Sequence, residues 1–238
     1  MKSRAVLLVL IGGLVVSSAV AADEGADALK QRIVAHARTV GPEDFAFTRT
    51  ARVEQIEGEK KETRTTVEKY DPRKPADQRW ALVSVDNRTP TAEELKEHRK
   101  EAPKRRVANY SRVADYVAAP STSAAGANGR TVFKIAQLPK ESVLVNNNDL
   151  SANSVAELTV DASGATPLVE QVQFTLVKPA RLMMVAKVER FTSTTRYRVL
   201  ADGKPAPVEQ VSEMTGSMMG KAGRIKTMLN YSDHARAR

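Results

Sequence analysis

The sequence predicts an α+β fold, mainly β, in which a curved antiparallel sheet covers two to three helices. Segments with alternating apolar and polar residues fill most of the chain, as expected of strands with one buried face. Turn residues separate many of these segments at hairpin spacing. Few helical patterns lie between them, so we expect the strands to pair antiparallel and the helices to cover one face.

The composition is that of a single globular domain. The chain has 238 residues, of which 42% are hydrophobic, and it contains no cysteine. A chain of this length buries about 70–75% of its unfolded surface, so its core needs no disulfides. The lack of cysteine excludes thiolate zinc sites, iron–sulfur clusters and cysteine nucleophiles. Because no repeat or linker is visible, we expect one domain over residues 22–238.

The N-terminus has the pattern of a secretory signal. Basic residues at Lys2 and Arg4 precede an apolar run over 5–16, and the small residues of Ala19-Val20-Ala21 follow. The run is too short for the roughly 20 residues that span a bilayer. We therefore expect a signal peptide over residues 1–21, cleaved after Ala21 or Ala22, and a periplasmic mature protein.

The first half of the chain alternates between helical and strand patterns. Apolar residues at helical spacing predict a helix that ends before Gly41-Pro42. Alternation and a high content of Thr and Val then predict three strands. The helix and the three strands are expected over 23–40, 45–54, 63–70 and 78–85.

Two further helices are predicted before the centre of the chain. Thr91 and Glu94 have the Thr-x-x-Glu spacing of a capping box, in which each side chain bonds a free backbone N–H of the first turn. This spacing predicts a helix over 92–102, which Pro103 ends. Apolar residues at helical spacing predict a second, short helix over 107–117, and small residues predict a loop over 121–129.

The second half consists of strand patterns to the end. The clearest alternation is in Gln171–Leu176, where Val172, Phe174 and Leu176 share one face. We expect a turn at Thr192-Ser193-Thr194, between two separate strands. The predicted strands cover 131–136, 154–160, 167–177, 181–191, 195–200, 207–214 and 223–231.

No motif for catalysis or metal binding is visible. His36, His98 and His234 lie in separate segments without the spacing of a metal site, and we expect all three to be surface residues. The segment Gly216–Lys221 differs from a phosphate-binding loop, because only three residues separate its glycines and Ala222 follows the lysine. We therefore expect no catalytic residue, no metal, no cofactor and no enzymatic activity.

The chain is basic, with a formal net charge of +9, and a basic run follows Pro103. Lys104, Arg105 and Arg106 are candidates for contact with an anionic membrane surface or an acidic envelope protein; the alternative is an ordinary solvated segment. Nucleic acid is not expected as a partner, because Tyr110 is the only nearby aromatic residue for base stacking.

The order of these features resembles that of the LolA/LolB/RseB-like superfamily of periplasmic proteins. A signal sequence, an N-terminal helix, an antiparallel meander and an inserted capped helix follow one another. The ending is similar too: Pro207-Val208 opens a strand, Gly220–Gly223 turns, and Ile225–Ser232 closes the sheet. Segments 71–75 and 88–90 also resemble exported proteobacterial proteins. The resemblance implies a half-barrel meander around helices, with an apolar cavity for lipid or lipoprotein acyl chains.

Two functions follow from this resemblance as hypotheses. The first is a monomeric, non-enzymatic periplasmic protein that binds lipid or acyl chains as a carrier. The alternative is an envelope protein-interaction or stress-sensing module with the same fold and no lipid. An open apolar pocket of several hundred Å³ on the concave face would favour the first. The residues selected for the cavity wall are Trp80, Leu82, Phe133, Phe174 and Met184.

The first prediction concerns export. Because a small-residue Ala-x-Ala sequence follows the apolar run, we expect the mature protein to begin at Ala22 or Asp23 and to be found in the periplasm. N-terminal sequencing of the soluble fraction tests this, and a chain that still began at Met1 would contradict it.

Overall fold

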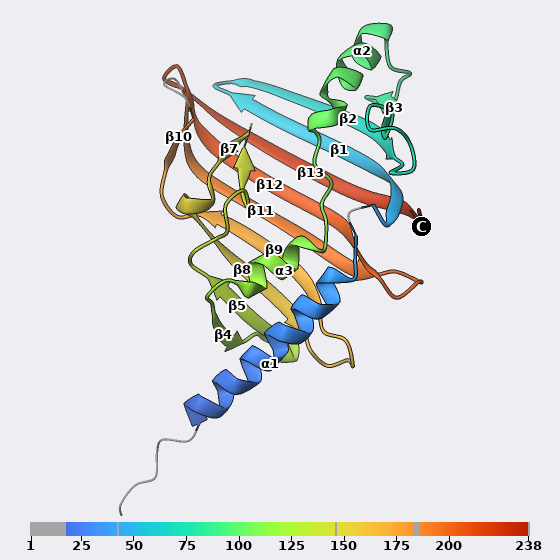
Figure 1. The fold of residues 1–238 in the computed structure, drawn as a ribbon. Coiled ribbons are helices and arrows are strands. Elements are labelled where there is room, and N and C mark those ends of the chain that lie inside the picture. The colour runs from blue at the N-terminus through green and yellow to red at the C-terminus, as the bar shows by residue number, and fades with distance from the viewer. Residues whose placement is uncertain (1–17, 42, 146, 183–185, 238) are drawn as a thin grey trace, which may run out of the picture.

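The computed structural model describes residues 18–41, 43–145, 147–182 and 186–237. It contains one large antiparallel sheet that curves around helices (Figure 1), which confirms the predicted fold class. Residues 1–17 of the predicted signal peptide lie outside the described residues. In chain order the elements are α1 (Ser18–Arg38), β1 (Phe45–Glu57), β2 (Lys60–Tyr70), β3 (Trp80–Val85), α2 (Ala92–Glu101), η1 (Ala102–Lys104), α3 (Arg112–Ala118), β4 (Thr122–Ala125), η2 (Ala127–Gly129), β5 (Thr131–Ile135), β6 (Leu144–Val145), β7 (Asn148–Asp149), η3 (Ser151–Asn153), β8 (Ser154–Asp161), β9 (Leu168–Leu176), β10 (Ala180–Leu182), β11 (Ala186–Val199), β12 (Pro205–Met218) and β13 (Lys221–Arg236).

The strand order brings the two ends of the chain together in the sheet. The order is β3-β2-β1-β13-β12-β11-β9-β8-β5-β4, while β10 pairs with β11 and β6 pairs with β7 in a separate small sheet. All of these pairings are antiparallel. The first strand, β1, pairs with the last, β13, and their common register runs from Phe45 opposite Arg236 to Glu57 opposite Gly223.

The main apolar core fills one half of the concave face. Helices α1 and α3 pack against each other over this half (Figure 1), and buried residues from both helices meet the inward side chains of β5, β8 and β9. On β9, Val172, Phe174 and Leu176 are buried together, as their alternation predicts. Each fully buried aliphatic or aromatic side chain stabilises the fold by about 1.5–3 kcal/mol. Other members of this core are Ile33, Ala37, Val113, Val117, Phe133, Ile135, Leu158 and Val160.

A second, smaller cluster lies under α2 at the other end of the sheet. It contains Phe47, Tyr70, Trp80, Ala102 and Tyr231. The rings of Phe47 and Tyr70 stack with centroids 5.0 Å apart, and the Trp80 ring lies 4.9 Å from Tyr70. The concave face therefore has a packed region at each end and less filling between them.

The segment Arg105–Ser111, called the strap below, crosses from α2 to α3 over the concave face (Figure 1). Tyr110 anchors it, because its side chain is buried and its hydroxyl accepts a 2.9 Å hydrogen bond from the backbone N–H of Val169. The Tyr110 ring also meets Tyr197 edge to face, with centroids 5.1 Å apart. Burial raises the pKa of Tyr110 to about 12, so its hydroxyl keeps its proton at physiological pH.

Some predicted boundaries differ from the observed ones. The turn expected at Thr192-Ser193-Thr194 is wrong, because β11 runs through these residues without a break. They pair with β9 on one side and β12 on the other. Threonine has a high strand propensity, and this central position in the sheet suits it. The loop expected over 121–129 contains the edge strand β4, and the helix expected over 107–117 begins only at Arg112.

The predicted capping box at α2 is confirmed. The Thr91 hydroxyl accepts a hydrogen bond from the Glu94 N–H at 3.2 Å, and the Glu94 carboxylate accepts one from the Thr91 N–H at 2.8 Å. Arg88 also donates to this carboxylate, which lowers the pKa of Glu94 to about 2. The start of α2 is thus defined by residues within a few positions of each other.

The second prediction tests this cap. We expect Thr91→Ala to lower the free energy of unfolding by about 1 kcal/mol, since a free N–H of the first turn loses its acceptor. Urea denaturation measures the change, and Thr91→Ser, which keeps the hydroxyl, is the matched control. Equal midpoints for wild type and Thr91→Ala would mean that the cap does not stabilise the protein.

Candidate functional site

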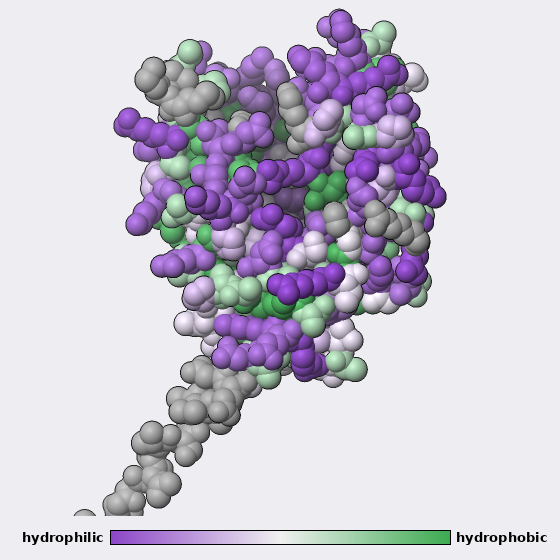
Figure 2. Space-filling view, in the orientation of Figure 1, coloured by the Kyte–Doolittle hydropathy of each residue, from purple (hydrophilic) through white to green (hydrophobic). Residues whose placement is uncertain are grey.

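The concave face carries an open groove of about 670 Å³ between the two packed regions. Figure 2 shows a hollow on this side of the molecule, with hydrophilic side chains around it and hydrophobic ones within it. Strands β2, β9, β11, β12 and β13 contribute lining residues from the sheet, while the strap, α3, Glu43, Arg79 and residues 141–144 contribute from the side. From the sheet these residues are Tyr70, Val172, Phe174, Thr195, Tyr197, Gln210 and Leu229.

The strand register explains why the groove is hollow. Thr195 lies opposite Gln210, and Gln210 lies opposite Leu229, so one row crosses three strands on the concave side. Two residues further along, Ser193 and Ser212 lie opposite each other, and Ser212 pairs with Thr227. Side chains this small do not fill the curvature of the sheet, so space remains above them.

Arginine side chains stand at the side of the groove. Arg106, from the strap, forms a 3.3 Å ion pair with Glu141, and Arg112, from α3, donates a 3.3 Å hydrogen bond to the Glu141 carbonyl. Arg79 forms a 2.7 Å ion pair with Glu43. The groove lining therefore contains three arginines and two glutamates.

A second hollow, of about 300 Å³, lies further along the same long strands. Its lining includes Leu182, Val188, Met214, Met218 and Ile225. Met214 follows Gln210 by four residues on β12, so both side chains are on the concave side. Methionine adapts its shape to varied apolar partners.

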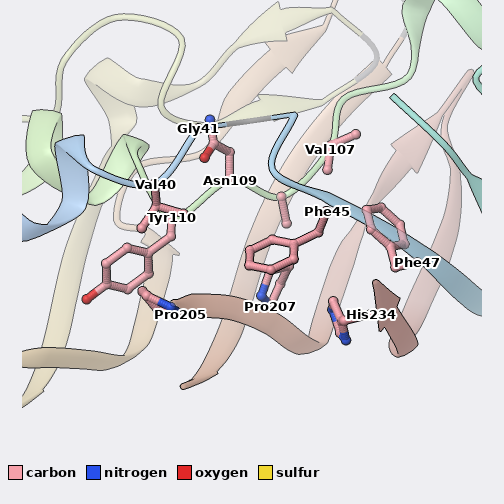
Figure 3. Close-up of a pocket in the computed structure, with 11 residues that line it drawn as sticks. Val40, Gly41, Phe45, Phe47, Val107, Asn109, Tyr110, Pro205, Pro207 and His234 are labelled. Atoms are coloured by element: carbon pink, nitrogen blue, oxygen red, sulfur yellow. The ribbon is translucent and has the colours of Figure 1, made fainter. Parts of the chain in front are cut away.

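A third space lies behind the strap and is too small for an organic ligand. Figure 3 shows Val107, Asn109 and Tyr110 of the strap around it, together with Phe45 and Pro207. Its volume is about 20 Å³, which is enough for about one water molecule. The strap thus closes this side of the concave face and leaves the larger groove on its other side.

A buried ionic network joins α2 and the strap to the sheet. The carboxylate of Glu68, on β2, accepts hydrogen bonds from Arg49 of β1 at 2.6 and 3.0 Å and from Nε2 of His98 at 2.9 Å. Arg105 donates to the same carboxylate. The Arg49 guanidinium also lies 4.0 Å from the centre of the Trp80 ring. One carboxylate on β2 thus binds groups from three other segments, β1, α2 and the strap.

The position of His98 corrects an expectation from the sequence. Predicted as a surface residue, it is only 6% exposed, because the helix turns it toward Glu68. Burial, and then the positive charge of Arg49, lower the pKa of His98, so the ring is neutral at pH 7 and donates through Nε2. Burial also lowers the pKa of Arg105 to about 10, and this side chain stays charged at pH 7.

The five residues selected for a cavity wall are not brought together. Phe174 lines the groove, whereas Phe133 is fully buried in the main core. Trp80 and Leu82 line a separate open hollow of about 560 Å³ beside α2. Met184 lies outside the described residues.

The basic run after Pro103 is divided between two environments. Arg105 is bonded to the buried Glu68, and Arg106 lies at the groove with a side chain that is 62% exposed. The side chain of Lys104 lies outside the described part of the chain.

Sequence reasoning did not find Arg112, Thr195 or Gln210 as lining residues of the groove. Their proximity depends on strand register and on the packing of α3, and neither has a local signal in the sequence.

Within the residues that the structure describes, no group of three or more His, Cys, Asp or Glu side chains could hold a metal ion. None of the described helices is both long enough and apolar enough to cross a membrane.

Comparisons with known proteins concern the fold. No family model matches the chain, and no curated protein matches its sequence. Similar solved structures include a LolA superfamily protein from Nitrosomonas europaea (12% identity, 90% of this chain and 93% of that chain covered, TM-score 0.36). A candidate outer membrane lipoprotein-sorting protein domain from Vibrio parahaemolyticus has 17% identity, coverage of 90% and 93%, and a TM-score of 0.39. A DUF1329 family protein from Desulfovibrio piger has 11% identity, coverage of 89% and 92%, and a TM-score of 0.24.

The third prediction concerns the buried network. We expect Glu68→Gln to lower the free energy of unfolding by about 3–5 kcal/mol, because Arg49 and Arg105 would keep their buried charges without a counter-charge. The matched control is Glu157→Gln, since Glu157 forms a 3.2 Å ion pair with Lys134 on the exposed side of the sheet. Chemical denaturation measures both variants. Equal small effects would show that the Glu68 network adds no more than a surface pair.

Proposed function

We propose that this protein is a non-enzymatic periplasmic binding protein that holds lipid or acyl chains in its concave groove. The observation that carries the proposal is the open groove of about 670 Å³ on the concave face. Small-molecule sites in proteins are concave, largely apolar and of about 300–1,000 Å³. A sheet with its concave face filled by its own side chains would not support this role.

The lining of the groove suits an apolar chain with a polar end. Phe174, Tyr197 and Leu229 provide apolar surface on the sheet, and Tyr116 meets Phe174 edge to face at 5.3 Å. The charged groups lie at the side of the groove, on the strap, on α3 and at Glu43, Arg79 and Glu141, while Thr195 and Gln210 are the polar residues on its sheet side. An amphiphile can therefore bury its chain against the sheet while its polar end stays near solvent.

Export supports the periplasmic part of the proposal. The basic start, the apolar run and Ala19-Val20-Ala21 form a cleavable signal pattern. In the periplasm, a protein that moves a lipid must cover its acyl chain from water, and a groove can do so without a chemical reaction. We therefore propose a carrier role and no catalytic residues.

The fourth prediction compares two buried phenylalanines. Phe174 lines the groove and Phe133 does not, although both are buried. We expect Phe133→Ala to lower the free energy of unfolding by about 3–5 kcal/mol, because it creates a void in a filled core. Phe174→Ala should cost less, since this side chain lacks packing partners on its groove side, and it should weaken binding of a fluorescent fatty acid.

Chemical denaturation and fluorescence titration measure these two quantities on the same protein samples. Circular dichroism at the titration temperature confirms that each variant is folded. If wild type binds no fatty acid below the aggregation limit of the probe, and Phe174→Ala costs as much as Phe133→Ala, lipid binding is wrong. The envelope protein-interaction role would then be the better explanation.

A further inference from the structure

Arg106 and Arg112 converge on one residue at the mouth of the groove. A terminal nitrogen of Arg106 lies 3.3 Å from the Glu141 carboxylate, and a terminal nitrogen of Arg112 lies 3.3 Å from the Glu141 carbonyl oxygen. The two guanidinium groups come from the strap and from α3, so they are neighbours only in the folded protein. Two guanidinium groups that contact the same residue are suited to bind a carboxylate or a phosphate.

The carboxylate that now occupies this place is weakly held. The side chains of Arg106 and Glu141 are 62% and 61% exposed. Exposed ion pairs contribute little to stability, because water screens them and two long side chains must be ordered. Arg112 also forms an exposed ion pair with Asp115 at 3.5 Å. An incoming anion can therefore replace the Glu141 carboxylate at small cost.

The inward-facing rows of β12 and β13 run from the groove toward the second hollow. The groove ends at Gln210 and Leu229, and the second hollow begins at Met214 and Ile225. These residues lie four positions apart on β12 and on β13, which corresponds to about 13 Å along a strand. Between the hollows, the row contains only the small side chains of Ser212 and Thr227 on these two strands.

We infer that the groove selects an anionic amphiphile, and this inference rests on the proposed function. The carboxylate or phosphate headgroup binds Arg106 in place of the Glu141 carboxylate and Arg112 in place of the Glu141 carbonyl, and the acyl chain passes over Ser212 toward the methionine-lined hollow. Charge complementarity at one end and apolar lining at the other determine this orientation. A fatty acid and a phosphate-headed lysolipid share the required chemistry.

The headgroup is tested with three probes that carry the same chain: palmitate, palmitoyl lysophosphatidic acid and uncharged monopalmitin. We expect at least one anionic probe to bind about tenfold or more tightly than monopalmitin, which corresponds to about 1.4 kcal/mol. The double variant Arg106→Gln, Arg112→Gln should remove this preference and leave monopalmitin binding unchanged. Glu141→Gln should tighten binding of the anionic probe, because it removes the competing carboxylate.

The control variant is Arg196→Gln, because Arg196 is an exposed arginine on the opposite face, ion-paired with Glu209 at 2.8 Å. It should leave all affinities unchanged. The anionic probe with the larger loss in the arginine double variant identifies the headgroup as a carboxylate or a phosphate. Equal binding of charged and uncharged probes, unaffected by the arginines, would overturn the inference and leave the proposed function standing. Failure of every probe to bind would overturn both.

The path is tested by a block between the two hollows. Ser212→Trp should weaken palmitate binding at least about tenfold and leave octanoate, whose chain does not reach the block, unchanged. The matched control is Val211→Trp on the next residue, whose side chain points to the opposite face. Denaturation midpoints establish that both variants are folded. Equal effects of Ser212→Trp on the two acids would contradict the path along the strands.

Discussion

Strand β1 pairs with β13 over most of its length, and this contact between the two ends of the chain positions everything on the concave face. On one side, β1 carries β2, β3 and α2; on the other, β13 leads through β12 and β11 to the main core. The register places Arg49 opposite Tyr231 and Ala51 opposite Leu229. A slip of one residue would turn each inward side chain outward, so the ionic network and the groove would both be lost.

The Glu68 network helps to attach α2, a helix with little apolar surface, to the sheet. Helix α2 is highly charged, and His98 is its one buried residue. Such a helix gains little from apolar burial, so hydrogen bonds from His98 and Arg105 to one carboxylate take over part of its attachment. Buried charges are expensive to desolvate, and their value lies in fixing one arrangement rather than in net stability. Here the network fixes where the strap begins, and Tyr110 fixes where it ends.

The groove shows how a fold can keep a surface unfilled. Packing voids reduce stability, because the side chains that line them lose contacts on one side. The core under α1 and α3 is well filled, as the burial of Phe133, Leu158 and Val169 shows, and it can offset this loss. Serine and threonine on the neighbouring strands keep the sheet regular and leave space above it. These polar side chains can also bond to water, so exposing them to solvent costs less free energy than exposing apolar side chains.

The sequence by itself determined the features that depend on neighbouring residues. The capping box of Thr91 and Glu94 and the buried face of Val172, Phe174 and Leu176 follow from spacings of two or three positions, because local geometry decides them. The order of these elements was enough to predict an antiparallel sheet over helices.

Tertiary structure alone decided the features that join distant segments. Glu68 and His98 are 30 residues apart, and Arg106 meets Glu141 across 35 residues, so neither pair has a local signal. Phe174 and Trp80 look alike as apolar strand residues, yet they lie in different hollows, because strand order separates β9 from β3. Which inward-facing side chains border open space depends on strand register and on where the strap crosses, and periodicity carries no information on either.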